Sequence, residues 1–485
     1  MRIKKQLLSI ALLPLVISLT SCDNIAFTNA KNSVVEEEIE ERLDPDALNA
    51  AGEEEFKCPT LEEVTINKKD YLTNKAIKPI EVPHIYINTE NNVGITSKYN
   101  YVNCTVSMDN CENQYQLSNV TGQVRVRGNS TANLPKKPYR FKFDKKISFF
   151  GHEKNKSWCL LADYRDPSSM HNWTALGLSK KGYLDNLPYE FVNRHVRVYV
   201  NGSYTGLYLL TENCDEKAGR LNMAYNPADY TYDKQGFIAE LDASAPDDSG
   251  EVLDKTYFKF NTPDGSTRYI GVKYPEVEDF ASETAYMQFF NGVKSYFNNL
   301  ATALYSGDFN NCDEYIDQAS LIDQTIIDQL LGETDHSHKS FKFYRLPGEK
   351  KLRFGPPWDY DLALSSDWRI SICSAIGKFR TSYVNWIGQK YFATEQAKKA
   401  IAKRWLTRGV SVAKDTLSRI EIYSKQIDKE NKLDAQKWYV GTYGTRQTLT
   451  SNIYELVEKN YEFLKEYIVG VSNAMSQLYI GVLNN

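Results

Sequence analysis

The sequence predicts an α+β protein with a sheet-rich N-terminal half and a helix-rich C-terminal half. Short runs of alternating apolar and polar residues, bounded by Gly, Asn and Pro, recur between residues 83 and 275. Long segments with helical periodicity dominate from about residue 277 onward. Strands followed by helices are typical of a fold whose helices lie to one side of a sheet, so we expect a functional site between the halves.

Individual elements of both halves follow from local patterns. Strands are expected at 123–127, 139–143 and 196–200, and the last of these runs into Asn201-Gly202, a strong hairpin signal that predicts a return strand at 204–210. One helix, at about 168–181, interrupts the strands. The helices of the second half are expected at 283–305, 314–333, 394–428 and 448–482.

The N-terminus predicts export from the cytoplasm. Basic residues precede an apolar run at 7–19 that ends in Thr20, Ser21 and Cys22, the order of a secretory signal peptide. The run is shorter than the ~20 residues of a membrane-spanning helix. Leu19 to Cys22 resembles the lipobox of bacterial lipoproteins, which implies lipidation of Cys22. We therefore expect a signal peptide at 1–21 and a non-cytoplasmic protein that is lipid-anchored to the bacterial cell envelope, at the outer membrane or cell surface. A cleaved signal with an incidental Cys is the alternative.

Charge and cysteine content divide the remaining chain. Residues 36–55 hold ten acidic residues and a single basic one, Arg42, so 22–80 is interpreted as an acidic flexible tether. The folded domain is expected at 81–482, sheet-rich over 81–275 and helix-rich over 276–482. No domain-wide basic field is present, so no nucleic-acid partner is expected. Cys104 and Cys111 could form a disulfide in an oxidising compartment.

Two clusters in the first half could bind an anion. Arg127, Asn129 and Ser130 lie in a Gly-containing turn after a strand, where backbone N–H groups and a guanidinium can face phosphate. An ordinary turn capped by its own polar side chains is the alternative. In the run that follows, Lys136–Asp144, a lysine on the strand, such as Lys142, could contact phosphate oxygens as a point charge. A solvated basic face explains that pattern equally well.

A third cluster could bind a divalent cation. Asp335 and Asp359 would flank a hairpin, and Asp359 and Asp361 would project the same way from an extended chain. Such carboxylates, with water and substrate phosphate, suit Mg²⁺. A satisfied polar loop is the alternative. Two nearby histidines at 336 and 338 do not form a zinc motif, and the sequence has no CxxC, HExxH, GxSxG or GxxxxGK[ST] pattern.

Five short runs, taken in order, resemble the hallmark segments of the CotH family, the spore-coat-H-like atypical protein kinases. They are RGNST at 127–131, KKPYRFKF at 136–143, NGSYTGLYLLTE at 201–212, GFIAELD at 236–242 and PWDYD at 357–361. The resemblance implies an atypical protein-kinase-like fold. It also implies transfer of the γ-phosphoryl group of ATP, with Mg²⁺ or Mn²⁺, to Ser or Thr of a secreted or envelope protein.

The resemblance also implies roles for the candidate residues. Lys142 or Lys137 would contact phosphates together with Arg127, Asn129 and Ser130. Asp335 would take the place of the catalytic-loop Asp, and Asp359, with Asp361, would hold the metal ion. Ser340 stands five residues after Asp335, where a kinase has a metal-binding Asn. Glu212 would pair with the lysine. The competing hypothesis is a non-catalytic, adhesin-like binding module on the same fold.

Overall fold

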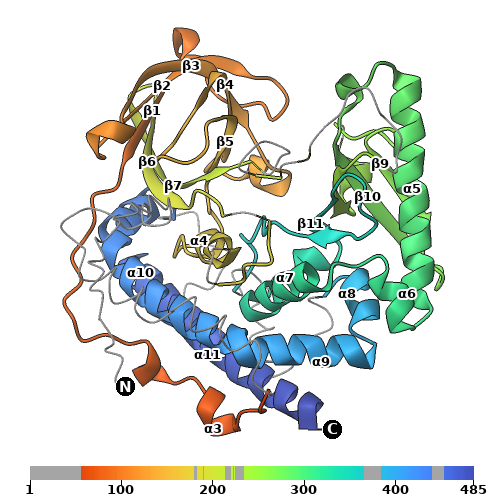
Figure 1. Ribbon diagram of the computed structural model, residues 1–485. Helices are drawn as coiled ribbons and strands as arrows, with labels where there is room; N and C mark the ends of the chain where they lie inside the picture. The colour runs from red at the N-terminus through yellow and green to blue at the C-terminus, as the bar shows by residue number, and fades with distance from the viewer. Residues whose placement is uncertain are drawn as a thin grey trace, which may run out of the picture.

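The sheet-rich part of the computed structural model is a closed barrel (Figure 1). The structure describes residues 56–179, 183–188, 190–213, 220–221, 223, 234–248, 250–364, 384–439 and 453–484. The barrel strands are β1 (His84–Thr89), β2 (Val102–Asp109), β3 (Leu117–Val126), β4 (Tyr139–Ile147), β5 (Asn155–Leu161), β6 (Arg194–Val200) and β7 (Ser203–Glu212). Their order is β1-β2-β3-β4-β5-β7-β6, and parallel pairing of β1 with β6 closes the barrel.

Alternation of side chains along the strands fills the barrel. In β4, Tyr139, Phe141 and Phe143 are buried, whereas Arg140 and Lys142 point out of the barrel. The β6–β7 hairpin turns at Asn201 and Gly202, whose φ angles of 48° and 77° are those of a tight turn with both central residues left-handed. The predicted strands and hairpin are therefore confirmed.

A second sheet crosses the boundary between the two halves of the chain. Its order is β12-β11-β8-β10-β9. The strands are β8 (Phe237–Asp242), β9 (Tyr257–Asn261), β10 (Thr267–Tyr274), β11 (Lys339–Arg345) and β12 (Arg353–Phe354). Because β11 and β12 come from the helix-rich half, the two halves are less separate than the sequence predicts. Helix α5 (Glu283–Tyr305) covers this sheet, with Phe297 against Phe258 and Phe343 (Figure 1).

The helices of the C-terminal part are α6 (Phe309–Asp313), α7 (Gln318–Leu331), α8 (Trp386–Tyr391), α9 (Glu395–Arg404), α10 (Val410–Trp438) and α11 (Ile453–Asn484). All but the short helices α6 and α8 lie close to where the periodicity predicts them. The run predicted at 394–428 is divided by a π-helical turn, Trp405–Gly409. Helix α10 ends at Trp438, ten residues past the end of the predicted run at 428. The helix predicted at 168–181 is a shorter one, α4 (His171–Leu176), followed by a 3-10 turn.

Buried polar contacts attach the barrel to α10. The Lys136 ammonium, 1% exposed, lies 2.9 Å from a carboxylate oxygen of Asp434, and the other oxygen accepts the Leu207 N–H at 2.8 Å. Arg197 of β6 donates to both carboxylate oxygens of Glu430. These contacts fix the barrel on the helical part, so the loops that leave the barrel have defined places relative to the C-terminal loops.

The packed chain begins earlier than the sequence predicts. Residues from the interval assigned to the tether form a short helix, α3 (Leu61–Val64), and Ile66 exchanges two hydrogen bonds with the side chain of Asn473 on α11. The signal peptide, Cys22 and the acidic run lie outside the described residues. Within the residues that the structure does describe, no helix has the length and apolar character to span a bilayer.

The disulfide considered between Cys104 and Cys111 is absent, and both thiols are free. Cys104 lies inside β2, which continues to Asp109. A strand rises about 3.3 Å per residue, so Cys104 lies roughly 17 Å from Asp109 at the end of β2. The two residues from Asp109 to Cys111 can recover at most about 7 Å, which leaves the two cysteine Cα atoms roughly 10 Å apart or more. A disulfide needs Cα atoms within about 7 Å, so this pairing is wrong.

Candidate active site

A pocket of about 670 Å³ lies between the barrel and the second sheet. The barrel contributes the end of β3, the turn after it and the outward face of β4, and the second sheet contributes β8, β10 and β11. Residues of two loops also line it, namely Ser244, Asp248, Gly250 and Glu251 after β8, and Trp358, Asp359, Asp361 and Leu362 after β12. The charged residues around it are Lys98, Arg125, Arg127, Arg140, Glu240, Asp242, Asp248, Glu251, Lys273, Glu276, Asp335, Lys339, Lys342, Asp359 and Asp361.

The turn after β3 forms the barrel wall of the pocket. Gly128 has a φ of 87°, and a Cβ there would lie 2.1 Å from the Thr131 hydroxyl oxygen, so the turn needs glycine. This tight path presents Arg127, Asn129 and Ser130 to the pocket. The guanidinium of Arg127 lies 5.1 Å from the ring centroid of Trp358, which places a cation of the barrel against the opposing loop.

Asp335 reaches the pocket from the connection between α7 and β11. Helix α7 ends at Gly332, whose φ of 64° is the left-handed conformation common after a helix, and the chain turns back into β11. The Asp335 carboxylate is 7% exposed and lies 2.9 Å from the Lys339 ammonium. The acid is therefore held by a cation of the next strand, at the wall of the pocket.

Buried His336 connects this turn to the loop that carries Asp359. Its Nδ1 lies 2.9 Å from an Asp328 carboxylate oxygen, and its Nε2 lies 2.8 Å from the Trp358 carbonyl oxygen. Burial lowers the pKa of His336, but the Asp328 carboxylate opposes this effect and raises the value to about 9. A charged imidazolium donates from both nitrogens, so both contacts are hydrogen bonds that hold the loop.

Asp359 and Asp361 enter the pocket from that loop. The Ser340 hydroxyl donates to a carboxylate oxygen of Asp359 at 3.0 Å, and both residues have left-handed backbones, with φ of 56° and 67°. Such conformations are uncommon for non-glycine residues and often occur at functional sites. The loop is therefore not the extended chain that the sequence predicts at Asp359, although both aspartates line the pocket. Burial and the neighbouring Asp359 charge raise the pKa of Asp361 well above its usual value.

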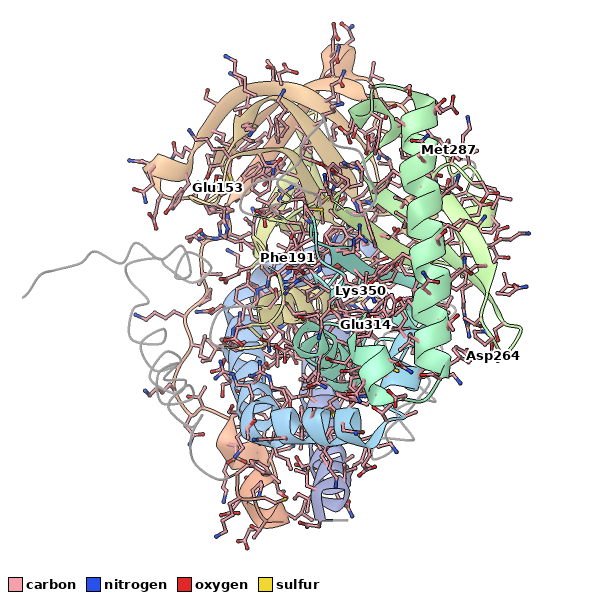
Figure 2. All side chains as sticks on the ribbon, turned by 45° about the vertical axis from the view of Figure 1, so that its right-hand side comes forward. Glu153, Phe191, Asp264, Met287, Glu314 and Lys350 are labelled. Atoms are coloured by element: carbon pink, nitrogen blue, oxygen red, sulfur yellow. The ribbon has the colours of Figure 1, made fainter. Side chains whose placement is uncertain are left out.

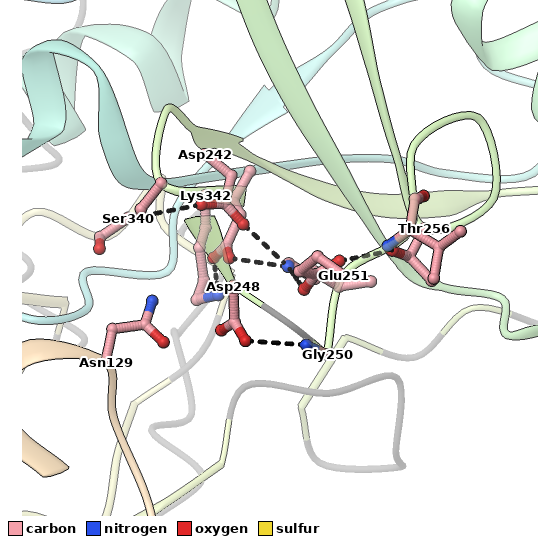
Figure 3. Close-up of polar contacts among 12 residues, drawn as sticks. Asn129, Asp242, Asp248, Gly250, Glu251, Thr256, Ser340 and Lys342 are labelled. Atoms are coloured by element: carbon pink, nitrogen blue, oxygen red, sulfur yellow. Dashed lines mark hydrogen bonds and ion pairs between the residues drawn. The ribbon is translucent and has the colours of Figure 1, made fainter. Parts of the chain in front are cut away.

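The opposite wall, formed by the second sheet, is a set of lysine–carboxylate pairs (Figure 3). Lys342 of β11 lies 2.5 Å from Glu240 of β8, and Lys273 of β10 lies 3.3 Å from Glu240 and 3.1 Å from Asp242. Burial raises the pKa of Glu240, but the two lysines outweigh it and lower the value to about 2. Figure 3 shows Asn129 facing this wall from the barrel side.

The structure brings most of the predicted site residues together. Those around the pocket are Arg127, Asn129, Ser130, Asp335, Ser340, Asp359 and Asp361. Lys142 is exposed on the outer face of β4 and is not among the lining residues, whereas Arg140, two positions earlier, is. One such step moves a side chain about 7 Å along a strand, which takes Lys142 beyond the pocket.

Lys137 and Glu212 also lie elsewhere. Neither Lys137 nor Glu212 lines the pocket. The Lys137 ammonium donates to the Ala132 carbonyl oxygen at 2.8 Å. The Glu212 carboxylate is buried, accepts the Val192 N–H and lies 3.6 Å from Arg220. The pair expected between Glu212 and a lysine of the KKPY run is therefore replaced by a pair with arginine.

Sequence reasoning missed the lysines of the second sheet that line the pocket. Lys342 alternates with Phe341 and Phe343, so its position on the polar face of a strand was available as a signal. Lys273 has no comparable signal, because only the long-range pairing of β8 with β10 and β11 brings it beside Glu240.

Loop carboxylates that face an arginine-bearing turn across an open pocket are typical of proteins that bind phosphate groups with a divalent cation. The comparison with family models agrees with this class. The chain belongs to the CotH kinase protein family, whose model matches residues 124–470. The matched range includes the second sheet, most of the barrel and all the pocket residues from Arg125 onward. Membership implies kinase activity and the use of ATP. None of the curated proteins compared with the chain matches it.

Proposed function

We propose that the protein is a metal-dependent kinase that transfers the γ-phosphoryl group of ATP to Ser or Thr side chains of secreted or envelope proteins. Family membership supports the kinase class. The supporting observation in the structure is that Arg127, Asp335 and Asp359, far apart in the sequence, line one pocket. A pocket of about 670 Å³ lies within the usual range of small-molecule sites, which suits a nucleotide.

The lining residues divide between phosphate contacts and acid–base chemistry. Arg127, with Asn129 and Ser130 on the same turn, offers a guanidinium and polar groups to phosphate oxygens. Asp335 takes the proton of the acceptor hydroxyl while the hydroxyl oxygen bonds to the terminal phosphorus of ATP. The bond from that phosphorus to the bridging oxygen breaks, and ADP leaves with the electron pair. Arg140 supplies a second cation on the barrel side.

The residues present fit a divalent cation bound together with a nucleotide. Asp359 and Asp361 supply carboxylate oxygens, which Mg²⁺ prefers, and Ser340 holds Asp359 in place. Over the described ranges, no group of three or more His, Cys, Asp or Glu is arranged to hold a metal unaided. Phosphate oxygens and water would complete the shell, as is usual for Mg²⁺. The ion would neutralise charge on the phosphates during transfer.

Phosphoryl transfer is tested with the full-length protein, labelled ATP, and Mg²⁺ or Mn²⁺. We expect autophosphorylation or labelling of a protein acceptor, and a loss of at least 100-fold in Asp359→Asn and in Asp335→Asn. Glu153→Gln is the control, because Glu153 is exposed on the barrel, outside the pocket (Figure 2). Binding of an envelope component by a folded protein that binds no nucleotide would instead support the adhesin-like module.

We further propose that Cys22 anchors the protein to the cell envelope through lipid. Metabolic labelling with a radioactive fatty acid tests this directly. The unmodified protein is expected to carry the label and to fractionate with membranes, and Cys22→Ala is expected to lose both properties. A label retained in Cys22→Ala would contradict the proposal.

A further inference from the structure

An acidic residue that follows barrel strand β5, Asp163, faces the loop that carries Asp359 and Asp361. Asp163 follows β5 and is 7% exposed. It lines a small cavity together with both aspartates and with Arg127. Its sequence neighbourhood gives no metal or nucleotide motif, so only the fold brings this carboxylate close to the loop that carries Asp359 and Asp361.

Among the described residues, one of the two oxygens of the Asp163 carboxylate has no hydrogen-bond partner. One oxygen, Oδ1, accepts the side-chain N–H of Asn172 at 2.6 Å. The other, Oδ2, is buried and makes no hydrogen bond within the described part of the chain. An unpartnered buried carboxylate oxygen is costly, so its retention here calls for a ligand or solvent contact that offsets the cost.

The size of the cavity indicates what that contact is. Its volume is about 20 Å³, which is room for about one water molecule. Its polar lining residues include Asp163, Asp359, Asp361 and Thr131, together with the cations Arg127 and Lys136. A buried water needs two to four polar partners, and these residues can supply them. A water molecule fits this space between the barrel carboxylate and the two loop carboxylates.

A further contact couples Asp163 to the same loop. Asn172, which donates to Asp163, accepts the backbone N–H of Tyr360 at 2.9 Å, between the two loop aspartates. Asp163 itself has a φ of 46°, an uncommon conformation that costs energy in a residue with a side chain. Three observations therefore connect Asp163 with the loop that carries Asp359 and Asp361. They are its strained backbone, its unpartnered Oδ2 and its link through Asn172 to Tyr360.

We infer that Asp163 is a positioning residue of a divalent-cation site, where its Oδ2 accepts a hydrogen bond from a water molecule coordinated to the ion held by Asp359 and Asp361. The inference rests on the proposed function, which supplies the ion. Mg²⁺ and Mn²⁺ commonly keep water ligands, and residues that orient such ligands typically change metal affinity 10- to 100-fold when replaced.

The test compares Mn²⁺ affinity, measured by electron paramagnetic resonance with and without ADP, in the full-length protein and in Asp163→Asn. Asn adopts left-handed backbone readily and its Oδ1 can still accept from Asn172, so the variant is expected to fold. The substitution removes the carboxylate charge of residue 163 and replaces the acceptor oxygen Oδ2 with an NH2 group. We expect Mn²⁺ binding to weaken by 10- to 100-fold and the metal concentration for half-maximal activity to rise in proportion.

Asp166→Asn is the matched control. Asp166 is also buried, but it accepts the backbone N–H groups of Ser168, Met170 and His171 at the start of α4 and does not line the cavity. This variant is expected to lower the melting temperature without changing Mn²⁺ affinity.

The outcomes separate this inference from the proposed function. If Asp163→Asn binds Mn²⁺ as well as the unmodified protein, or if Asp166→Asn weakens binding equally, the inference is overturned even where kinase activity is present. If Mn²⁺ binding depends on Asp163 but no phosphoryl transfer occurs, the inference holds and the proposed function fails. An unmodified protein that binds no Mn²⁺ in either condition overturns the inference.

Discussion

Glu333 shows how a single buried side chain beside the site can control the pH dependence of stability. It is fully buried, and its Oε1 accepts the Asp335 N–H at 2.6 Å. Burial raises the pKa of Glu333 from 4.5 to about 8. The charge of His336 opposes this rise, and the charge of Asp335 adds to it. The folded protein therefore keeps a proton on Glu333 that the unfolded chain has lost between these two pH values.

This difference in proton binding predicts a loss of stability as the pH rises. The contribution of Glu333 is fully present below pH 4.5 and disappears through about pH 8, because the folded state binds more protons in that window. We expect Glu333→Gln, which keeps the acceptor oxygen, to flatten the fall of melting temperature between pH 5 and 6.5. The contribution of His336 falls only from pH 6.5 to about 9, so it does not affect this lower range. If the melting temperature of Glu333→Gln fell between pH 5 and 6.5 as steeply as that of Glu153→Gln, the prediction would be contradicted.

Residue types and spacing predict the site residues in turns better than those in regular strands. Asp335, Asp359 and Arg127 stand in turns whose sequences distinguish them, and the structure places them around one pocket. Lys142 stands in a regular strand, where alternation gives the face of the sheet but not the distance from the pocket. The partner of Glu212 is Arg220, and no local sequence pattern connects these two residues.

At the scale of elements, the contact between α10 and the β6–β7 hairpin holds the barrel in place. Lys136 and Asp434 are each 1% exposed in their side chains. A Cβ at Gly206 would lie 2.5 Å from Asp434 Oδ1, so the strand approaches the helix too closely for any larger residue there. The pair is therefore enclosed by backbone and has no route to solvent.

Removing one member of this pair is expected to destabilise the protein strongly. Asp434→Ala leaves the Lys136 ammonium buried without its counter-charge, and the Leu207 N–H loses its acceptor. We expect a loss of about 3–5 kcal/mol in the free energy of unfolding, measured with denaturant. The control is Glu455→Ala, whose pair with Lys459 is 2.6 Å long but about half exposed and should contribute less than about 1 kcal/mol. Equal losses in the two variants would contradict this account.

Elements with local signals were predicted closely, and those that depend on distant contacts were not. Helix α5 occupies the range that its periodicity predicts, and the Asn201-Gly202 turn forms the expected hairpin. The second sheet could not be predicted, because its central strand β8 pairs with β11 about 100 residues later in the chain. The π-helical turn between α9 and α10 was not predicted, because its sequence, Trp405–Gly409, contains no proline to mark a break between the helices.

At the scale of the whole molecule, the pocket depends on how the barrel meets the second sheet. The barrel rests on α10, whereas the second sheet is covered by α5 (Figure 1). Across the pocket, Lys98 of the barrel lies 3.1 Å from Asp248 in the loop after β8, and the Tyr99 hydroxyl donates to the same carboxylate at 3.3 Å. Lys98 also donates to Asn129 at 3.3 Å. The two sheets thus connect directly at the rim of the proposed nucleotide site.

This rim contact predicts a salt-dependent rate of nucleotide release. Asp248→Asn removes the charge that faces Lys98 but keeps an acceptor oxygen for the Gly250 N–H. A partly exposed pair of this kind contributes up to about 1 kcal/mol, so we expect ADP to dissociate up to about fivefold faster at low ionic strength. The difference should shrink toward 1 M salt, where the Debye length falls to about 3 Å.

Stopped-flow release of a fluorescent ADP analogue measures this rate. The control is Asp254→Asn, which breaks a similar 2.9 Å contact between Asp254 and Lys294 away from the pocket. That variant should release the analogue at the unmodified rate at every salt concentration. If Asp248→Asn does the same at low salt, the two sheets do not need the Lys98–Asp248 contact to retain nucleotide. Retention would then depend on the residues inside the pocket, with Arg127 the first to replace.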